Sequence, residues 1–301
     1  MNIASNRRFA IWIAFTILIS FCGTSSFAQS FDSALLDRAR VASNMIPGDY
    51  PLEVRFQGFS EWSAPLSEYL EDATDKPVDW VAGVFQIRFQ DGWIMVDAGA
   101  EKTHAGSKGF SDADYGDYER ALAQASLTVI THEHADHASS LVRGKLAEMA
   151  AKRALLTLEQ RDSMLKAETD WPVVRISPEQ AEKFLVVGYE ELLPIAPGVV
   201  LIKAPGHTKG SQILFVSFAR GEELLLVGDV VWHKSQIANA SQKSSSWDYL
   251  GEDKLALKIQ VEWLKDVSES ETHVVIAHDL SAIEAQLSDG VLIDGLYLPS
   301  Q

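Results

Sequence analysis

Cysteine is almost absent from this 301-residue chain, which has Cys22 alone. The first 28 residues have the layout of a secretory signal: two arginines, a mostly apolar run from Phe9 to Phe21, and a stretch of small residues that ends near Ala28. We predict cleavage after Ala28, which would remove the single cysteine. The mature protein would then have no disulfide, no thiolate ligand and no cysteine nucleophile.

Long apolar runs are also lacking. About 20 residues are needed to cross a bilayer, and the run within the signal has thirteen. An uncleaved anchor is the alternative to a cleaved signal. We expect a periplasmic or secreted protein with no stable membrane association after signal cleavage.

Positive charge is scarce. Residues 29–301 have 24 Lys and Arg against 42 Asp and Glu, a net charge of −18, and no basic run interrupts them. This balance excludes a polyanionic partner such as nucleic acid. A small-molecule substrate is the partner we expect, and the sequence leaves the oligomeric state open.

About 273 residues follow the predicted cleavage point, enough for one large α/β domain over residues 29–301. Strands alternate with helices along it, and Gln90-Asp91-Gly92 indicates a hairpin turn. The expected elements are strands at 81–89, 93–97 and 127–131, a helix near 118–125, a strand set between 199 and 231, a polar loop at 233–251, an amphipathic helix at 253–265, and a strand at 273–279 before a terminal helix and strand.

A buried strand runs repeatedly into a short polar cluster, at "VDAGA", "THEHADH", "APGHT", "VGDVVWH" and "AHD". In layered α/β folds, ligands bind outside the carboxyl ends of strands. We therefore expect these five polar strand ends to converge on one edge of the fold.

The segment "HEHADH" is the strongest signal for chemistry. His132 and His134 are two residues apart, so they point the same way in an extended segment, and Asp136 and His137 follow as the chain turns toward a helix. Neutral imidazole and carboxylate suit zinc, and also iron or manganese. A solvated polar loop is the alternative reading. Three later strand ends offer further ligands, namely His207, Asp229 and His278.

The order "HEHADH", "GHT", "GD" and a final strand-end histidine resembles the metallo-β-lactamase-fold hydrolase superfamily, from about Val81 to about Asp279. The resemblance implies a four-layer αββα sandwich with a binuclear metal site at one edge of its two sheets. By position, it implies that His132, His134 and His207 hold the first ion, that Asp136, His137 and His278 hold the second, and that Asp229 bridges them. Asp97 resembles the superfamily's buried aspartate that orients a ligand histidine, with a simple turn residue as the alternative.

Two residues after the bridging aspartate need their own interpretation. Trp232 stands where similar acyl-homoserine lactonases carry a tyrosine that supports a carbonyl oxygen; tryptophan offers an indole donor and an apolar wall instead, or packs in the core. His233 could line the pocket and contribute to acid–base work. We also expect pocket walls from residues 98–118, residues 235–246 and Trp247.

The resemblance implies two divalent metal ions, zinc first, with iron or manganese as alternatives. Such a pair can share a water and lower its pKa to about 7, so that a bridging hydroxide attacks the carbonyl of a small ester, lactone or lactam. Asp136 would pass the proton to the leaving group. A phosphoester hydrolase is an alternative within the same class.

Other classes remain as rivals. A true β-lactamase is disfavoured because those enzymes lack an aspartate at position 229. Persulfide dioxygenases of the superfamily look similar but use one iron, which makes an oxidoreductase the second hypothesis. Flavodiiron proteins carry glutamate where this chain has His134. A metal-dependent binding protein without turnover is disfavoured by the complete ligand set.

Overall fold

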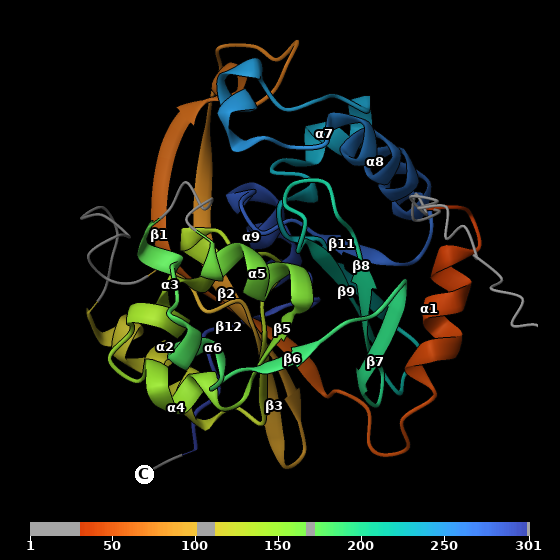
Figure 1. Ribbon diagram of the computed structural model, residues 1–301. Helices are drawn as coiled ribbons and strands as arrows, with labels where there is room; N and C mark the ends of the chain where they lie inside the picture. Colours follow the sequence, from red (N-terminus) through yellow and green to blue (C-terminus); the bar gives the residue numbers. More distant parts are fainter. Residues whose placement is uncertain (1–30, 101–111, 167–171, 300–301) are drawn as a thin grey trace, which may run out of the picture.

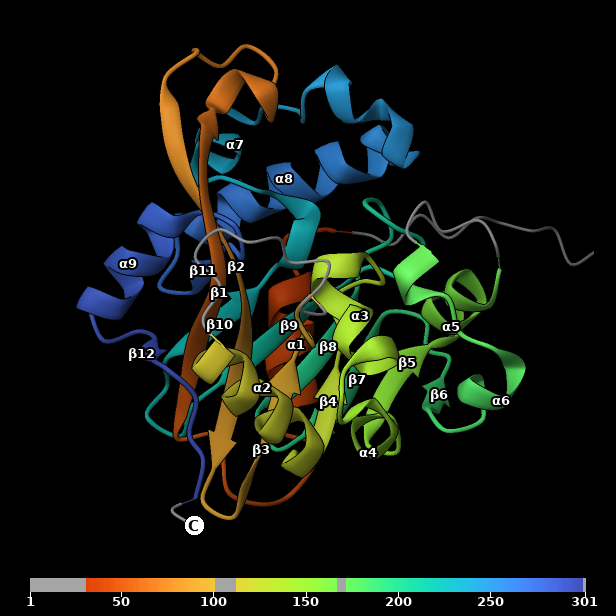
Figure 2. The same cartoon turned by 90° about the vertical axis from the view of Figure 1, so that its left-hand side faces the viewer.

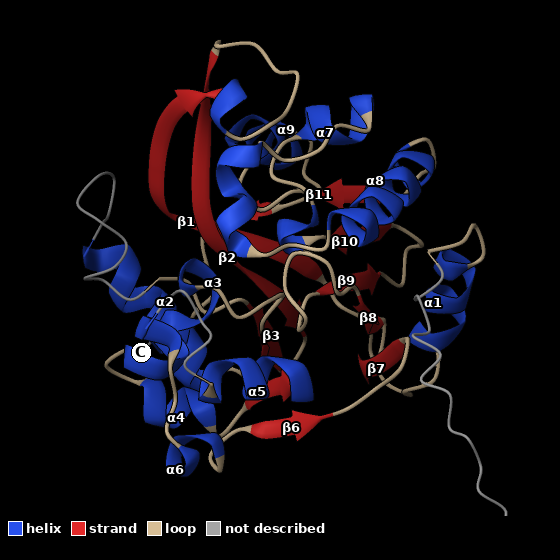
Figure 3. Cartoon of the chain, turned by 45° about the horizontal axis from the view of Figure 1, so that its top comes forward, coloured by secondary structure: helices blue, strands red, loops and turns tan. Residues whose placement is uncertain are grey.

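Two β-sheets packed face to face lie at the centre of the molecule (Figure 1, Figure 3). The computed structural model describes residues 31–100, 112–166 and 172–299. The predicted signal at 1–28 and most of the predicted wall segment 98–118 lie outside these ranges.

The first sheet has seven strands in the order β12-β1-β2-β3-β4-β5-β6. The predicted hairpin is confirmed: β2 and β3 pair antiparallel, with Phe89 opposite Gly92. The strands from β3 to β6 are parallel, so the carboxyl ends of β3 and β4 lie side by side. The strand bounds are β1 Glu53–Pro65, β2 Pro77–Phe89, β3 Gly92–Val96, β4 Leu127–Val129, β5 Ala154–Thr157, β6 Leu185–Val187 and β12 Ile293–Asp294.

The second sheet has five strands in the order β11-β10-β9-β8-β7. Its central strands are apolar on both faces, as expected for strands buried between layers. Its bounds are β7 Leu192–Ala196, β8 Val199–Lys203, β9 Gln212–Ser217, β10 Glu223–Leu226 and β11 His273–Val275.

Three apolar cores separate four layers. Between the sheets, side chains such as Phe85 and Val96 meet Leu201 and Leu214. The helices α2 (Asp112–Gln124), α3 (Ala135–Arg143) and α4 (Ala147–Ala151) cover the outer face of the first sheet. The helices α1 (Leu35–Ser43) and α8 (Lys254–Ser268) cover the outer face of the second. The predicted αββα sandwich is therefore confirmed.

The remaining helices connect these layers. They are α5 Leu158–Leu165, α6 Pro178–Ala181, α7 Lys234–Asn239 and α9 Leu280–Ser288, with short 3-10 helices η1 Leu66–Glu68, η2 Pro172–Val174, η3 Gly228–Val230 and η4 Ser245–Leu250. Among the helices of the described ranges, none combines the length and apolar character that a bilayer crossing requires.

The hairpin of β1 and β2 extends beyond the body of its sheet, at the top of the view in Figure 2. Its tip is tied to the segment before η4. Ser244 donates its backbone N–H to the carbonyl of Tyr69 at 2.8 Å, and the indole of Trp247 donates to the carbonyl of Glu68 at 2.9 Å. The hairpin tip thus fixes a segment that is about 175 residues away in sequence.

Two sequence expectations need correction. The segment 233–251, predicted as a polar loop, contains α7 and η4, because His233 caps α7 and Ser244 caps η4 through side-chain acceptors. The amphipathic helix is confirmed as α8, but Leu255 is 70% exposed and Ile259 is 40% exposed. Its buried face instead runs through residues such as Leu257, Val261 and Leu264.

Candidate metal centre

Five strands end at one edge of the sandwich and deliver the predicted ligands there. Two groups of three have ligand atoms within 4.8 Å of one another. We name them the first cluster (His132, His134 and His207) and the second cluster (Asp136, His137 and His278). The structure thus brings together side chains that are up to 146 residues apart, in the grouping that the sequence predicted.

Asp229 lies between the two clusters and presents one oxygen to each. Its Oδ2 is 3.4 Å from His207 Nε2 and 3.8 Å from His132 Nε2. Its Oδ1 is 3.2 Å from both His137 Nε2 and His278 Nε2. A carboxylate in this position can bind two ions at once, which is the bridging geometry.

The spacing of these atoms fits metal coordination. Tetrahedral ligands about 2.0–2.1 Å from zinc stand roughly 3.3–3.4 Å apart. The nitrogen atoms His207 Nε2 and His134 Nδ1 are 2.9 Å apart, His137 Nε2 and His278 Nε2 are 3.2 Å apart, and Asp136 Oδ2 is 3.6 Å from each of the last two. Both clusters therefore have the dimensions of a four-ligand site once Asp229 is included.

Two buried atoms of the site have no hydrogen-bond partner, His132 Nε2 and Asp229 Oδ1. A buried polar atom left unsatisfied costs about 1–3 kcal/mol, and buried polar groups in proteins are normally paired. An ion in each cluster would satisfy both atoms. The residues present therefore fit two divalent ions.

The second ring nitrogen of several ligands is held by a partner, which leaves the metal-facing nitrogen free. His137 Nδ1 is 2.9 Å from Asp97 Oδ2, and His278 Nδ1 donates to the carbonyl of Val81 at 2.8 Å. His207 Nδ1 contacts Glu252 Oε1. Such partners fix the tautomer and the ring orientation of metal-binding histidines.

Asp97 is placed where the sequence predicted an orienting aspartate. It is 1% exposed, and besides His137 it accepts a hydrogen bond from the backbone N–H of Thr131 at 2.7 Å. Its backbone has φ of +63°, the left-handed region that aspartate tolerates better than most residues. This turn aims the carboxylate back across the end of β4 toward the ligand it orients.

The two clusters differ in electrostatics. Burial lowers the pKa of each histidine of the first cluster below its ordinary value. Burial opposes protonation in the second cluster too, but nearby carboxylates outweigh it and raise the pKa of His137 and His278. Burial likewise opposes ionisation of Asp229, yet the surrounding imidazoles hold the pKa of its carboxyl well below its ordinary value. The first cluster is thus neutral and ready for a cation, whereas the second holds protons that a cation must displace.

Trp232 contacts the bridging carboxylate directly. Its indole Nε1 donates to Asp229 Oδ2 at 2.7 Å, and its side chain is buried. The indole donor is therefore committed to a ligand, and Trp232 does more than pack in the core. The donor does not face outward as the tyrosine of the lactonases is described to do.

Aromatic rings border both clusters. The ring of Trp232 lies 6.0 Å from that of His207, and the ring of Trp62 lies 6.2 Å from that of His278. Tyr69 joins these two tryptophans: its hydroxyl accepts from Trp62 Nε1 at 3.0 Å, and its ring is 6.0 Å from Trp232. Trp247, predicted as a wall residue, packs 5.2 Å from Trp232. We name Trp62, Tyr69, Trp232 and Trp247 the aromatic wall.

His233 lies apart from the ligands in the contacts of the described residues. Its Nε2 is 3.5 Å from Asp279 Oδ2, its Nδ1 accepts from the backbone of Ser235, and its ring is 5.9 Å from that of Trp80. These contacts account for a helix cap and give no support to an acid–base role.

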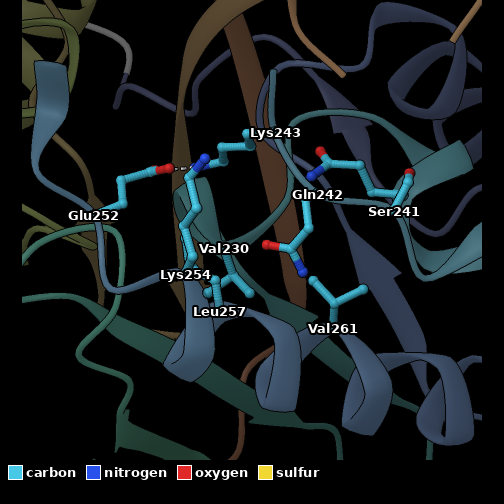
Figure 4. Close-up of a pocket in the computed structure, with 9 residues that line it drawn as sticks. Val230, Ser241, Gln242, Lys243, Glu252, Lys254, Leu257 and Val261 are labelled. Carbon is cyan, nitrogen blue, oxygen red and sulfur yellow. Dashed lines mark hydrogen bonds and ion pairs between the residues drawn. The ribbon is translucent and has the colours of Figure 1, made fainter. Parts of the chain in front are cut away.

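Two buried charged residues next to the site escaped the sequence analysis, Lys243 and Glu252. Their side chains are 3% and 4% exposed, and Lys243 Nζ lies 2.6 Å from Glu252 Oε1 (Figure 4). Both occur in a polar stretch without periodicity, where lysine and glutamate are ordinarily solvated. Apart from the nearness of Glu252 to a predicted helix, the sequence offers no signal for them.

Comparison with known proteins agrees with this geometry. The family model described as the metallo-beta-lactamase superfamily matches residues 84–264. No curated protein sequence matches the chain. Because the matched segment covers more than half of the chain, the protein belongs to the metallo-β-lactamase superfamily, and it is a metal-dependent hydrolase of that superfamily.

Several solved structures share the fold. A quorum-quenching N-acyl homoserine lactone lactonase is 18% identical, with a TM-score of 0.62 over 78% of this chain and 95% of that chain. A probable metal-dependent hydrolase from Staphylococcus aureus is 12% identical, with a TM-score of 0.59 over 77% and 91%. A dizinc quorum-quenching lactonase in complex with a product is 14% identical, with a TM-score of 0.54 over 73% and 85%. At these identities the similarity concerns the fold.

Proposed function

We propose that this protein is an exported binuclear metal hydrolase that opens a small carboxylic ester or lactone. The observation that carries the proposal is Asp229, which presents one oxygen to each cluster at 3.2–3.8 Å from the facing nitrogens. A site for one ion needs no such bridge. Zinc is the ion that the nitrogen-rich ligand set favours, with iron or manganese as alternatives.

Two divalent ions, when bound, supply an activated water at neutral pH and polarise the acceptor oxygen of the substrate. The residues of the chain then divide the remaining work. Asp229 holds the spacing of the two clusters, and Asp97 keeps the ring of His137 aimed into the second. No serine or cysteine nucleophile is required.

Asp136 is the residue that we assign to proton transfer. Its side chain is 40% exposed, whereas Asp229 and His137 are buried. Its Oδ2 faces the second cluster, so its other oxygen can receive a proton and deliver it to a departing alkoxide. Exposure on the substrate side is what a proton donor at this position needs.

A lactone or an unstrained ester is favoured within the class. Several of the similar solved structures are lactonases, and one holds the product N-hexanoyl-L-homoserine at its metal centre. The aromatic wall beside both clusters offers apolar surface for an acyl group.

A substrate panel on protein of known metal content tests the proposal. Chromogenic esters, lactones, a cephalosporin and a phosphotriester would be assayed before and after exhaustive chelation. We expect ester or lactone hydrolysis that chelation removes and zinc restores. His278→Ala should abolish it, while His273→Ala should not, since His273 is exposed at the far end of the same strand. One iron per chain with oxygen uptake and no hydrolysis would support the oxidoreductase alternative instead.

We also propose export with processing after Ala28, motivated by the composition of the first 28 residues. Intact mass of protein from the extracytoplasmic fraction tests this point. Retention of residues 1–28 in that fraction would favour an uncleaved anchor.

A further inference from the structure

A buried lysine and a buried glutamate lie behind the first cluster and outside the ligand set. Lys243 comes from the segment that the β1–β2 hairpin tip holds in place, since it pairs with Leu70 in an isolated β-bridge. Glu252 follows Gly251, immediately before α8. Val230, Leu257 and Val261 line the same small pocket (Figure 4), so the pair stands against apolar side chains rather than in open water.

Every donor of Lys243 has a defined direction. Its Nζ donates to Glu252 Oε1 at 2.6 Å and to the backbone carbonyl of Asp229 at 2.7 Å. It also lies 3.9 Å from the ring centre of Trp232, a cation–π contact. One ammonium group therefore contacts the residue that bridges the clusters, the residue whose indole binds that bridge, and Glu252.

Glu252 extends this network to the first cluster. The same oxygen that accepts from Lys243 contacts His207 Nδ1. When His207 Nε2 faces an ion, Nδ1 carries the ring proton and donates it to this carboxylate, so the ring cannot rotate without losing a charge-assisted hydrogen bond. Lys243 in turn fixes Glu252, which has no other printed side-chain partner.

We infer that Lys243 and Glu252 form a positioning pair that orients His207 and the backbone of Asp229 for the first metal ion. The pair holds the first cluster as Asp97 holds the second: a carboxylate behind one histidine in each. The inference rests on the proposed binuclear site. It goes beyond that proposal because neither residue is a ligand, and because it makes the first ion depend on a segment anchored by the hairpin.

Metal affinity is the readout that separates positioning from simple structural support. Four variants of the full mature chain would be titrated with Zn²⁺ against a chromophoric chelator: Glu252→Gln, Glu252→Ala, Lys243→Met and the double variant Lys243→Met/Glu252→Gln. Glutamine keeps an acceptor for His207 Nδ1–H but loses the charge, so we expect first-ion affinity to fall about 10-fold, and alanine about 100-fold. Second-ion affinity should change less than the first in every variant.

Glu223→Gln is the matched control. Glu223 forms an ion pair with Arg40 at 2.8 Å and is partly buried, but it stands at the start of β10, six residues before Asp229. The same change there should leave both affinities within about twofold of the parent. Unfolding of the metal-free proteins would be measured alongside, because a merely structural pair would lower stability without a selective loss of the first ion.

The double variant covers the case in which a single change leaves an uncompensated buried charge and prevents folding. It removes both charges, so it should fold, and it should still show the weakened first ion. Parent-like binding of both ions by a folded Glu252→Gln or double variant would overturn the inference. Failure of the unmodified protein to bind two ions would instead refute the binuclear site itself.

Discussion

Replacement of Asp229 by asparagine should remove the second metal ion selectively, and the neighbouring indole gives the reason. Trp232 Nε1 donates to Asp229 Oδ2 at 2.7 Å. An amide in this place must turn its oxygen toward that donor. Its NH₂ group then occupies the position of Oδ1, which is 3.2 Å from both His137 Nε2 and His278 Nε2.

The preference for this amide orientation can be estimated. The opposite orientation would set two N–H groups against each other in a buried place, at a cost of about 1–3 kcal/mol. That energy corresponds to roughly a 5- to 140-fold preference for the NH₂ group to face the second cluster. There it donates to the nitrogens that should bind the ion. The first cluster keeps three histidines and a neutral oxygen.

The assay is metal content per chain after equilibration with Zn²⁺, with activity measured in parallel. We expect content to fall from about two toward one and activity to fall at least 10-fold. Cobalt(II) absorption spectra, compared with those of His134→Ala and His278→Ala, identify which ion is lost. Adding Trp232→Phe to the asparagine variant removes the donor, so part of the second-ion affinity should return.

Two results would refute this reasoning. One is loss of the first ion with retention of the second. The other is equal second-ion affinity in the single variant and in the double variant that lacks the indole, since the orientation argument depends on that donor.

Three further outcomes follow from the same geometry. Asp97→Asn removes the charged acceptor of His137 Nδ1–H, so second-ion affinity should fall about 10- to 100-fold in a chelator competition, and parent-like affinity would contradict the role of Asp97. Gly228→Ala places a Cβ 2.7 Å from Thr131 Cβ at φ of +51°, so the free energy of unfolding in urea should fall by about 1–3 kcal/mol or more; an unchanged midpoint would show that the turn relaxes. Carboxylates raise the pKa of His137 and His278, so these rings take up protons first as pH falls, and the second ion should leave at a higher pH than the first, whose histidines have a pKa lowered by burial; simultaneous release in a pH titration of bound metal would contradict this order.

The site was more predictable than its support because ligands are marked by residue type and spacing. "HEHADH" puts imidazoles and carboxylates where an apolar strand ends, and such a cluster has few other physical causes. The grouping of the ligands around Asp229 came from the family resemblance. Lys243 and Glu252 are common surface residues, and only the packing of α8 and of the hairpin tip buries them.

The strand β1 shows a second limit of sequence reasoning. Its buried residues begin in alternation, with Val54 and Phe56, but the next is Phe59. A bulge between Gly58 and Ser60 shifts the register of the pair and changes which residues face inward. A period of two broken in its middle is a weak signal, although it belongs to the longest hairpin of the fold.

The parallel pairing of β1 with β12 sets the order in which the molecule can be completed. Arg55, near the start of the mature chain, lies opposite Ile293, near its end. His278 is likewise held by β2, since Val81 exchanges backbone and side-chain hydrogen bonds with it. A growing chain has all ligands of the first cluster once residue 207 has been made, but the second cluster has to wait for 71 more residues. A chain that is truncated or still being synthesised can therefore hold at most one complete cluster, and the first ion has the earlier opportunity to bind.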